Sequence, residues 1–337
     1  MQKQAENLKS NSVKNPTFRI AVATYKRPDD LAHCLAALAP QVRKKENFKL
    51  VIVNDCTPSA DYDALINQYE DVIEYRVRKE NGGPGLARAT AFEDATEDYL
   101  VCTDDDCVPP DAWLDTLEAI VEVNPEVDLI AGAVEPVWTC KPGWYQKLLA
   151  VPVSYPMPHF ADDTLLTAVT ANCAFKRHTY ELVGGFTDDL RGATEDHFLT
   201  KRIIESGGSY MAPEFWITGH KAENTLRGIS SRFYGYGYGG AHTAVLKNSW
   251  QLADVGSDGT IAGALRMITQ KTQRAWKDEK NCKNGKLERV VFTLLNCLMA
   301  LQYERGWRAG LKRLNTGWPA KLPKAPKLVD RYVDFTV

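Results

Sequence analysis

The segment Asp98-Tyr-Leu-Val-Cys-Thr-Asp-Asp-Asp106 joins a short apolar run to three adjacent carboxylates. The apolar run predicts a buried strand, and the carboxylates follow at its carboxyl end. Three similar apolar runs precede it, at 18–23, 49–53 and 72–77, and helical patterns fill the intervals between them. This β-α-β-α-β-α-β order predicts an α/β fold with a Rossmann-like, mostly parallel central sheet that helices cover on both faces.

Polar residues stand where the predicted strands end. The first strand is followed by Thr24-Tyr-Lys-Arg-Pro28, the second by Asn54-Asp55 and the fourth by Asp104 to Asp106. In open parallel sheets, ligands bind beyond the carboxyl ends of the strands. We therefore expect these side chains to converge on one edge of the sheet and to form the functional site.

Composition excludes several classes of protein. The chain has 337 residues, of which 44% are hydrophobic, so it can bury a core and is not disordered as a whole. Its 41 basic and 43 acidic side chains give a formal net charge of −2. No global positive field would recruit phosphates, so we expect no nucleic-acid partner.

The sequence also bears on location. The N-terminal residues lack an apolar signal core, and the longest apolar run, 290–301, is interrupted by Thr293 and Asn296. That run is shorter than the ~20 residues that span a bilayer. Eight cysteines occur without a CxxC pair, which is typical of reduced, free thiols. We expect a cytoplasmic protein, and peripheral association with the inner face of the membrane stays open.

The three adjacent aspartates are candidates for metal binding. On an extended chain alternate side chains point the same way, so Asp104 and Asp106 would face one side and Asp105 the other. Packed like charges repel unless a cation or donors offset them, and carboxylates suit Mg²⁺ or Mn²⁺. The alternative is an acidic surface turn before a helix near Pro109 and Pro110.

The later half contains two more strand-like runs, at 129–137 and 167–175. It also offers further candidate residues, each with a structural alternative. Thr194 can cap a helix whose first turn holds Glu195 and Asp196, a placement that the helix dipole favours. The same carboxylates are suited to act as a general base toward an acceptor hydroxyl. His220 is either a metal ligand or a structural histidine. The alternation of Tyr and Gly over 234–239 is either a flexible aromatic platform for a sugar or a packed loop.

The glycine-rich stretch Asn81-Gly-Gly-Pro-Gly-Leu-Ala-Arg88 opens a predicted helix that runs to about Ala95. It lacks the Gly-Lys-Ser/Thr of phosphate loops, and it follows the third strand where the dinucleotide fingerprint follows the first. Backbone N–H groups at such a loop can still bind phosphate, and Arg88, one turn into the helix, is expected to reach the diphosphate.

Taken in order, these pieces resemble the family 2 glycosyltransferases of GT-A fold. The matching segments are 21–28, 51–55, 81–88, 103–106 with Pro109 behind it, 172–177, 184–186 and 194–197. The resemblance covers about residues 17–225. It implies a GT-A glycosyltransferase domain over 17–225. The sequence pattern itself predicts a flexible lead over 1–16 and a mainly helical C-terminal region over 226–337, with helices over 260–314. We expect this region to have an acceptor-side or interaction role.

The resemblance implies an enzyme of the hexosyltransferase class that uses a nucleoside-diphosphate sugar, a UDP-sugar being the commonest donor. The acceptor would be a glycan, a lipid-linked saccharide or a small molecule. It implies a Mn²⁺ or Mg²⁺ cofactor held by Asp106 and His220, with Asp196 as the general base and Glu195 as its neighbour that orients the acceptor. The residues implied to bind the nucleotide sugar are Thr24, Tyr25, Arg27, Asp55, Gly83, Arg88, Asp104 and Asp105.

The chain departs from the family pattern in places. It carries Asn54-Asp55 where two acids are common, and Pro84 stands in the glycine loop. The Gln-x-x-Arg-Trp motif of processive synthases is missing near 227–240, and so are transmembrane segments, which argues against a processive, membrane-embedded polymerase. The resemblance implies an inverting enzyme that acts by a single displacement. Two alternatives remain: a nucleotidyltransferase built on a related sheet, and a non-catalytic protein that binds nucleotide sugars. The oligomeric state is left open.

Overall fold

The computed structural model describes residues 15–138, 159–161, 164–187, 194–222, 225–246, 265–266, 269 and 286–314. A seven-stranded sheet forms its centre. In spatial order its strands are β11 (Tyr210–Met211), β6 (Leu129–Ala131), β10 (Asn172–Lys176), β4 (Tyr99–Asp104), β1 (Phe18–Thr24), β2 (Phe48–Asn54) and β3 (Ile73–Val77). The four strands from β4 to β3 are parallel, and β10 runs antiparallel to both of its neighbours. The mostly parallel sheet expected from the sequence is confirmed.

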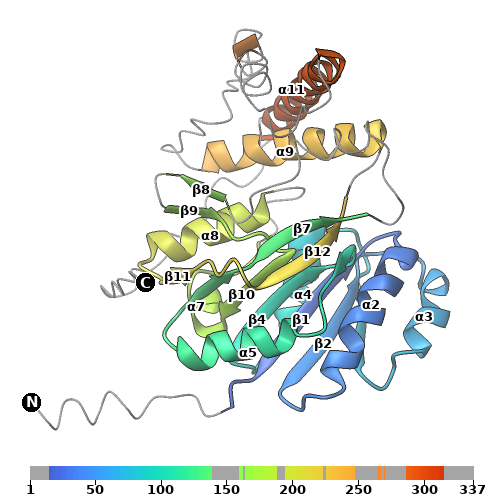
Figure 1. Cartoon of the computed structure of the whole chain (residues 1–337), viewed down its shortest axis with the longest axis vertical. Coiled ribbons are helices and arrows are strands. Elements are labelled where there is room, and N and C mark those ends of the chain that lie inside the picture. The colour runs from blue at the N-terminus through green and yellow to red at the C-terminus, as the bar shows by residue number, and fades with distance from the viewer. Residues whose placement is uncertain are drawn as a thin grey trace, which may run out of the picture.

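Helices cover both faces of this sheet (Figure 1). They are α2 (Pro28–Val42), α3 (Asp63–Asn67), α4 (Pro84–Phe92), α5 (Trp113–Val123), α7 (Arg177–Leu182) and α8 (Glu195–Glu205), with a 3-10 turn at Ser59–Asp61. Alternation along β1 explains the two layers, since successive side chains of a strand point to opposite faces. Phe18 and Ile20 pack with residues of α2 and α5, whereas Ala21 and Ala23 pack with residues of α4 and α8.

A second sheet meets the first at the end of β4. Its three strands, in order, are β5 (Cys107–Val108), β12 (Ile217–Lys221) and β7 (Ala133–Val137). The run 129–137 therefore forms two strands, β6 and β7, and the expectation of a single strand is wrong. The division falls at Gly132, where the chain leaves the first sheet and enters the second. A Cβ at Gly132 would lie 2.2 Å from the Asn172 side-chain nitrogen, so only glycine allows this approach. The strand expected over 167–175 is also divided, between β9 (Thr164–Thr167) and β10; β9 pairs with β8 (His159–Ala161).

The Tyr-Gly alternation lies in neither a flexible platform nor a loop. It belongs to α9 (Leu226–Leu246), which packs against α11 (Lys286–Leu314). The glycines permit close contact between the two backbones: a Cβ at Gly237 would lie 1.9 Å from the carbonyl oxygen of Tyr303, and one at Gly306 would lie 1.9 Å from that of Tyr234. The helical C-terminal extension is thus confirmed for these two helices.

The remaining expectations about the termini and cysteines have mixed outcomes. Most of the predicted lead over 1–16, and much of the helical region expected over 260–314, lie outside the described residues. The domain boundaries stay predictions. Within the described part of the chain, no helix is both long and apolar enough to cross a bilayer. The described cysteines are free thiols, as expected, and Cys140 and Cys282 lie outside that part.

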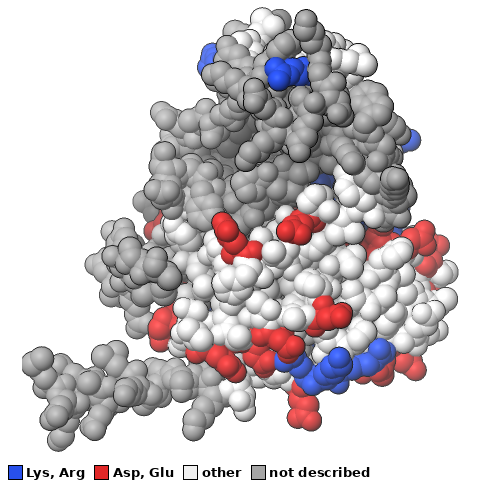
Figure 2. All heavy atoms as spheres, viewed as in Figure 1, with Lys and Arg blue, Asp and Glu red and all other residues white. Residues whose placement is uncertain are grey.

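The outer surface differs between the sheet domain and the helical extension. On the face shown in Figure 2, the acidic side chains in view lie over the sheet and its helices. Where α11 sits, at the top of the view, the described side chains in sight are basic or uncharged.

Candidate active site

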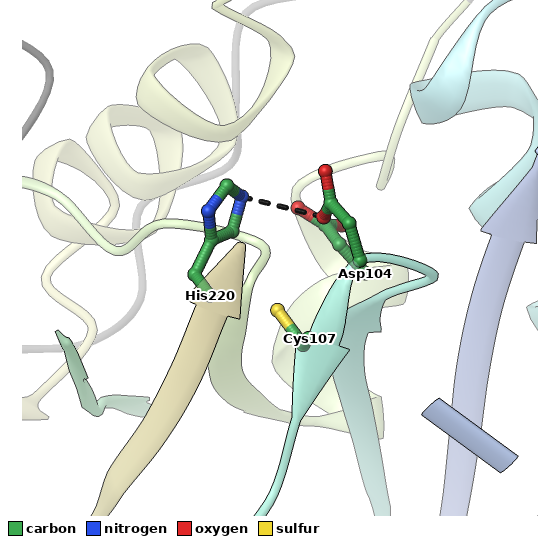
Figure 3. A group of neighbouring side chains, drawn as sticks. Asp104, Cys107 and His220 are labelled. Carbon is green, nitrogen blue, oxygen red and sulfur yellow. Dashed lines mark ion pairs between the residues drawn. The ribbon is translucent and has the colours of Figure 1, made fainter. Parts of the chain in front are cut away.

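The carboxylates at the end of β4 lie beside a histidine from a distant strand. Asp104 ends β4, and Cys107 begins β5, where it pairs with His220 of β12. Ligand atoms of Asp104, Asp106, Cys107 and His220 all lie within 4.8 Å of one another (Figure 3). The antiparallel pairing of β12 with β5 therefore brings His220 beside Asp104, although the two are more than a hundred positions apart in the sequence.

The donor atoms of this cluster fit a divalent cation. Oδ1 of Asp106 is buried without a hydrogen bond, and Nε2 of His220 lies 3.3 Å from it. Nδ1 of His220 lies 3.0 Å from the carbonyl oxygen of Lys221. A carbonyl only accepts, so Nδ1 carries a proton and Nε2 is the nitrogen that faces the carboxylates. The two carboxylates suit Mg²⁺ or Mn²⁺, and the imidazole beside them favours the transition metal Mn²⁺.

Cys107 was not among the residues expected at the site. Burial raises the pKa of its thiol well above the ordinary value, and the charges of Asp104 and Asp106 add to the rise. The thiol donates toward the carbonyl oxygen of Ala171 over 3.7 Å. Cys107 therefore lines the cluster as a neutral thiol. Its position three residues after Asp104 was visible in the sequence, but the sequence did not show the short strand that turns it inward.

Arg27 pairs with the other side of the aspartate turn. Its guanidinium lies 2.7 Å from Asp105 and 2.8 Å from Asp106. Burial raises the pKa of Asp105 to about 7, an effect that Arg27 opposes and Asp106 reinforces. Asp105 is fully buried and absent from the metal-capable cluster, so the three aspartates divide as their alternation along the chain suggested.

Asp55 and Gly83 contact each other. The buried Asp55 carboxylate accepts hydrogen bonds from the backbone N–H of Gly83 at 2.8 Å and of Gly82 at 3.0 Å, and from Nε of Arg78 at 2.9 Å. Gly83 has a φ of 85°, in the left-handed region that favours glycine. Asp55 thus fixes the loop that opens α4.

Tyr62 holds the first loop of the site. Its hydroxyl lies 3.0 Å from the hydroxyl of Thr24 and accepts the backbone N–H of Arg27 at 3.1 Å. Thr24 is buried, whereas Tyr25 is exposed and lies against the ammonium of Lys26. Thr24 is therefore part of the framework, whereas Tyr25, Lys26 and Arg27 are exposed side chains of this loop that a ligand can reach.

Positive φ angles at non-glycine residues concentrate on loops of the site. Among the described residues with such angles, three of four belong to these loops: Lys26 at 57°, Cys56 at 70° and Thr194 at 97°. Non-glycine residues in this region carry backbone strain, which clusters at functional sites.

Arg88 joins the two halves of the site. It is buried on α4, and its guanidinium pairs with Asp104 and with Glu195, the latter at 3.0 Å. Gly85, one turn earlier, makes room for this contact, because a Cβ there would lie 3.1 Å from Cγ of Glu195. Arg88 was expected near the diphosphate, and the structure places it inside a buried charge network.

Glu195 and Asp196 begin α8. Thr194 occupies the N-cap position as expected, but it is in the left-handed region and makes no capping hydrogen bond with its side chain. Burial raises the pKa of Glu195 to about 7; Asp196 adds to this rise, and Arg88 opposes it. Burial also raises the pKa of Asp196, although the backbone N–H of His197 donates to its Oδ1 at 2.7 Å. A carboxylate with a raised pKa is a stronger base than one in water.

Tyr236 of α9 is partly buried where the charges of the site act on it. Burial raises the pKa of Tyr236, the guanidinium of Arg232 opposes the rise, and the charges of Asp196 and Asp104 add to it. Neither residue was expected at the site. Only the packing of α9 over the sheet domain places them there, and no local motif indicated it.

A cavity of about 250 Å³ opens beside Asp106. It reaches across the second sheet to the start of α2. Its lining residues are Asp30, His33, Asp106, Val108, Val137 and Lys221. The metal-capable cluster therefore borders a space that can admit a small ligand.

Comparison with known proteins is consistent with this geometry. Residues 19–183 match the family model described as Glycosyl transferase family 2. These residues belong to glycosyltransferase family 2. The match runs from β1 to the end of α7 and includes the aspartate turn, whereas α8, β12 and the two C-terminal helices lie beyond it.

Individual relatives of this chain are distant. A glucosyl-dolichyl phosphate glucuronosyltransferase of Haloferax volcanii is 26% identical over 157 residues, which are 45% of this chain and 50% of the relative. A poly(ribitol-phosphate) beta-glucosyltransferase of Bacillus spizizenii is 30% identical over 91 residues, 26% of this chain and 14% of the relative. The chain thus matches half or less of the length of these curated relatives.

A solved structure shows the same fold. The mannosyltransferase PcManGT from Pyrobaculum calidifontis, in complex with GDP-Man and Mn²⁺, superposes with a TM-score of 0.56 at 17% identity. The superposition covers 91% of this chain and 93% of that one. The expected GT-A fold is therefore confirmed.

Proposed function

We propose that this protein is a non-processive, inverting glycosyltransferase of family 2. It moves a sugar from a nucleoside-diphosphate sugar, with a UDP-sugar favoured, to a hydroxyl of a glycan, a lipid-linked saccharide or another molecule. The observation that carries the proposal is the position of Arg88 between Asp104 and Glu195. Arg88 thereby joins the metal-capable cluster to the carboxylates Glu195 and Asp196. The first group is suited to activate the donor, and the second is suited to deprotonate the acceptor.

Asp106 and His220, with Asp104 beside them, would hold Mn²⁺ or Mg²⁺. The ion supplies charge neutralisation for the departing nucleoside diphosphate. The complex of the Pyrobaculum enzyme with GDP-Man and Mn²⁺ supports this assignment. In our proposal Arg27 restrains Asp105 and Asp106, so that the turn keeps its shape when the donor binds.

Asp196 acts as the general base in this proposal. It takes the proton of the acceptor hydroxyl while the oxygen attacks the anomeric carbon from the face opposite the leaving group. The new bond joins the acceptor oxygen to the anomeric carbon, and the bond from that carbon to the diphosphate oxygen breaks, so one displacement inverts the centre. The transition state is oxocarbenium-like, as in glycoside hydrolysis. Glu195 orients the acceptor and is itself held by Arg88.

The nucleotide would lie along the strand ends. Tyr25 is exposed and can contact the base or ribose, with Thr24 and Arg27 setting its loop. The carboxylate of Asp55 already accepts bonds from Gly82, Gly83 and Arg78. We therefore propose that Asp55 acts on the nucleotide through the glycine loop that it fixes.

The proposed setting is the cytoplasm, at the inner face of a membrane, with a lipid-linked acceptor. The name of the Haloferax relative, a glucosyl-dolichyl phosphate glucuronosyltransferase, describes a lipid-linked substrate and supports this choice. The name of the Bacillus relative describes a phosphate polymer instead, so a polymeric acceptor is the second candidate.

A thermal-shift screen of UDP- and GDP-sugars, with and without Mn²⁺, tests donor binding. We expect one nucleotide sugar to raise the unfolding temperature only when Mn²⁺ is present. Product analysis then separates the alternatives: release of a nucleoside diphosphate identifies a transferase, whereas release of pyrophosphate identifies a nucleotidyltransferase. Binding without turnover across the tested acceptors would indicate a non-catalytic protein.

A further inference from the structure

The near-zero net charge of the chain hides a strong asymmetry. Residues 261–337 contain 16 of its 41 basic side chains but only 6 of its 43 acidic ones. This stretch therefore carries a formal charge of +10, and the preceding 260 residues carry −12. A basic segment attached to an acidic body attracts anionic surfaces locally, whatever the total charge is.

The outer side of α11 exposes an apolar stripe. Leu287, Val290, Leu294 and Leu301 are 69%, 47%, 64% and 50% exposed. Their spacing of three, four and seven residues puts them on one face of the helix. The opposite face is buried against α9 through Met299, Ala300, Tyr303 and Trp307. Large aliphatic side chains in a contiguous exposed row usually mark an interaction site.

The same stripe becomes basic toward the end of the helix. Arg305, Arg308 and Lys312 continue the row at helical spacing, and all three are exposed. Arg308 pairs with the buried Glu304, and Arg305 contacts Gln302. Figure 1 shows α11 on the side of α9 that faces away from the sheet.

We propose that this outer face of α11 docks on an anionic lipid surface. An interfacial helix buries its aliphatic face at the headgroup boundary, and basic side chains add about 1 kcal/mol each near anionic lipids. The inference deepens the proposed function, on which it rests for naming the acceptor: a lipid-linked saccharide held at the same surface.

Two other occupants fit the row less well. A second copy of the chain would bring two segments of charge +10 together, which like-charge repulsion disfavours. An anionic polymer would match the arginines and lysines but would leave the leucines in water. A lipid surface satisfies both parts of the row.

Sedimentation of the full chain with lipid vesicles tests the proposal. We expect binding to phosphatidylcholine vesicles that contain phosphatidylglycerol, weak binding to phosphatidylcholine alone, and a loss of binding at high salt. The double variants Leu287→Ser/Leu294→Ser and Arg305→Gln/Lys312→Gln should each bind at least about tenfold more weakly. These side chains are exposed, so the fold should survive the changes.

Matched controls lie on the sheet domain. Val123 and Phe215 are 79% and 69% exposed, and Lys44 is exposed on the same domain. The variants Val123→Ser, Phe215→Ser and Lys44→Gln should bind vesicles as the unchanged chain does. Equal losses in these controls would show that the effect is general and would overturn the assignment to α11.

Three further outcomes would contradict the proposal. These are vesicle binding that both α11 variants retain, a dimer in solution that Leu287→Ser/Leu294→Ser abolishes, and binding to inorganic polyphosphate without binding to vesicles. The assay uses no donor and is repeated with Asp196→Asn. Failure of the catalytic proposal would therefore leave vesicle binding intact, and failure of docking would leave nucleotide binding intact.

Discussion

The guanidinium of Arg88 donates from Nη1 to Oε1 of Glu195 across 3.0 Å, although the two residues lie 107 positions apart. The other terminal nitrogen of the same group pairs with Asp104. One buried cation thus links the aspartate turn after β4 to the start of α8. This link holds the metal-capable cluster and the proposed base in a fixed relation, because movement of either carboxylate would cost the buried Arg88 one of its two ion pairs.

Replacing Arg88 tests this link. Removing one partner of a buried ion pair typically costs about 3–5 kcal/mol, because it leaves an uncompensated charge. Arg88→Met should therefore lower the free energy of unfolding by that order, measured with urea. Arg43→Met is the matched control, since Arg43 pairs with Asp71 at the exposed surface, where solvent screens the pair. Equal losses in both variants would show that Arg88 has no special structural role.

The rate of transfer should depend on pH through the carboxylates of α8. Burial raises the pKa of Glu195 to about 7 and also raises that of Asp196. A general base works only when deprotonated, so kcat should fall as the pH drops through the raised pKa of this coupled pair. Glu195→Gln should move this inflection to lower pH, because it removes one of the two coupled carboxyls. A flat profile between pH 5 and 8 would contradict the assignment.

The raised pKa of Glu195 should also make the stability of the fold depend on pH. Stability should fall as the pH rises, whereas kcat should increase. The folded chain keeps a proton on Glu195 up to about pH 7, whereas the unfolded chain releases it near the ordinary value of 4.5. The contribution of this group to stability is therefore present at low pH and is lost as the pH rises through that window. The unfolding temperature of Glu195→Gln, compared with that of the unchanged chain, should rise progressively over the window. A constant difference would mean that Glu195 ionises normally.

Asp106 should control the metal dependence of donor binding. Titration calorimetry with UDP and with GDP should show tighter binding in the presence of Mn²⁺. Asp106→Asn should abolish this effect of Mn²⁺. The loss of metal affinity should exceed the ~10–100-fold that is typical when a residue that only orients a metal ligand is replaced. Asp71→Asn, a change at an exposed carboxylate, should leave the effect of Mn²⁺ unaltered. Unchanged Mn²⁺ dependence in Asp106→Asn would exclude this residue as a ligand.

The packing of α9 against α11 should depend on Gly237 and not on Gly235. Gly237→Ala would place a Cβ 1.9 Å from a carbonyl oxygen of α11, and overpacking of this kind costs about 1–3 kcal/mol. At Gly235, in the same helix, an added Cβ would meet no atom within 4 Å, so Gly235→Ala should instead stabilise by about 0.5–1 kcal/mol. Thermal unfolding of the two variants distinguishes them. Similar shifts in one direction would contradict the close packing.

The sequence predicted the features that depend on local order along the chain. Four strands with helices between them set the parallel sheet, and strand alternation separated Asp105 from Asp104 and Asp106. Contacts between distant segments were not predictable in this way. Arg88 was expected to face the diphosphate. Its partner Glu195 lies 107 positions later in the sequence, so no local pattern indicated this pair.

The same limit explains the errors in the later half. The Tyr-Gly stretch gave no helical signal, because glycine disfavours isolated helices. It is helical because its glycines fit against Gly306 and Tyr303 of a helix some seventy residues onward. Cys107 and Tyr236 reach the site through β5 and α9, elements whose placement only tertiary packing decides.

The central claim is that Asp196 removes the acceptor proton, and Asp196→Asn tests it most directly. The measurement is kcat for release of nucleoside diphosphate in the presence of acceptor, together with the affinity for the donor. General-base assistance is typically worth ~10²–10⁴-fold, so kcat should fall by that order while donor affinity stays unchanged. Turnover close to that of the unchanged chain, with donor binding intact, would contradict the account.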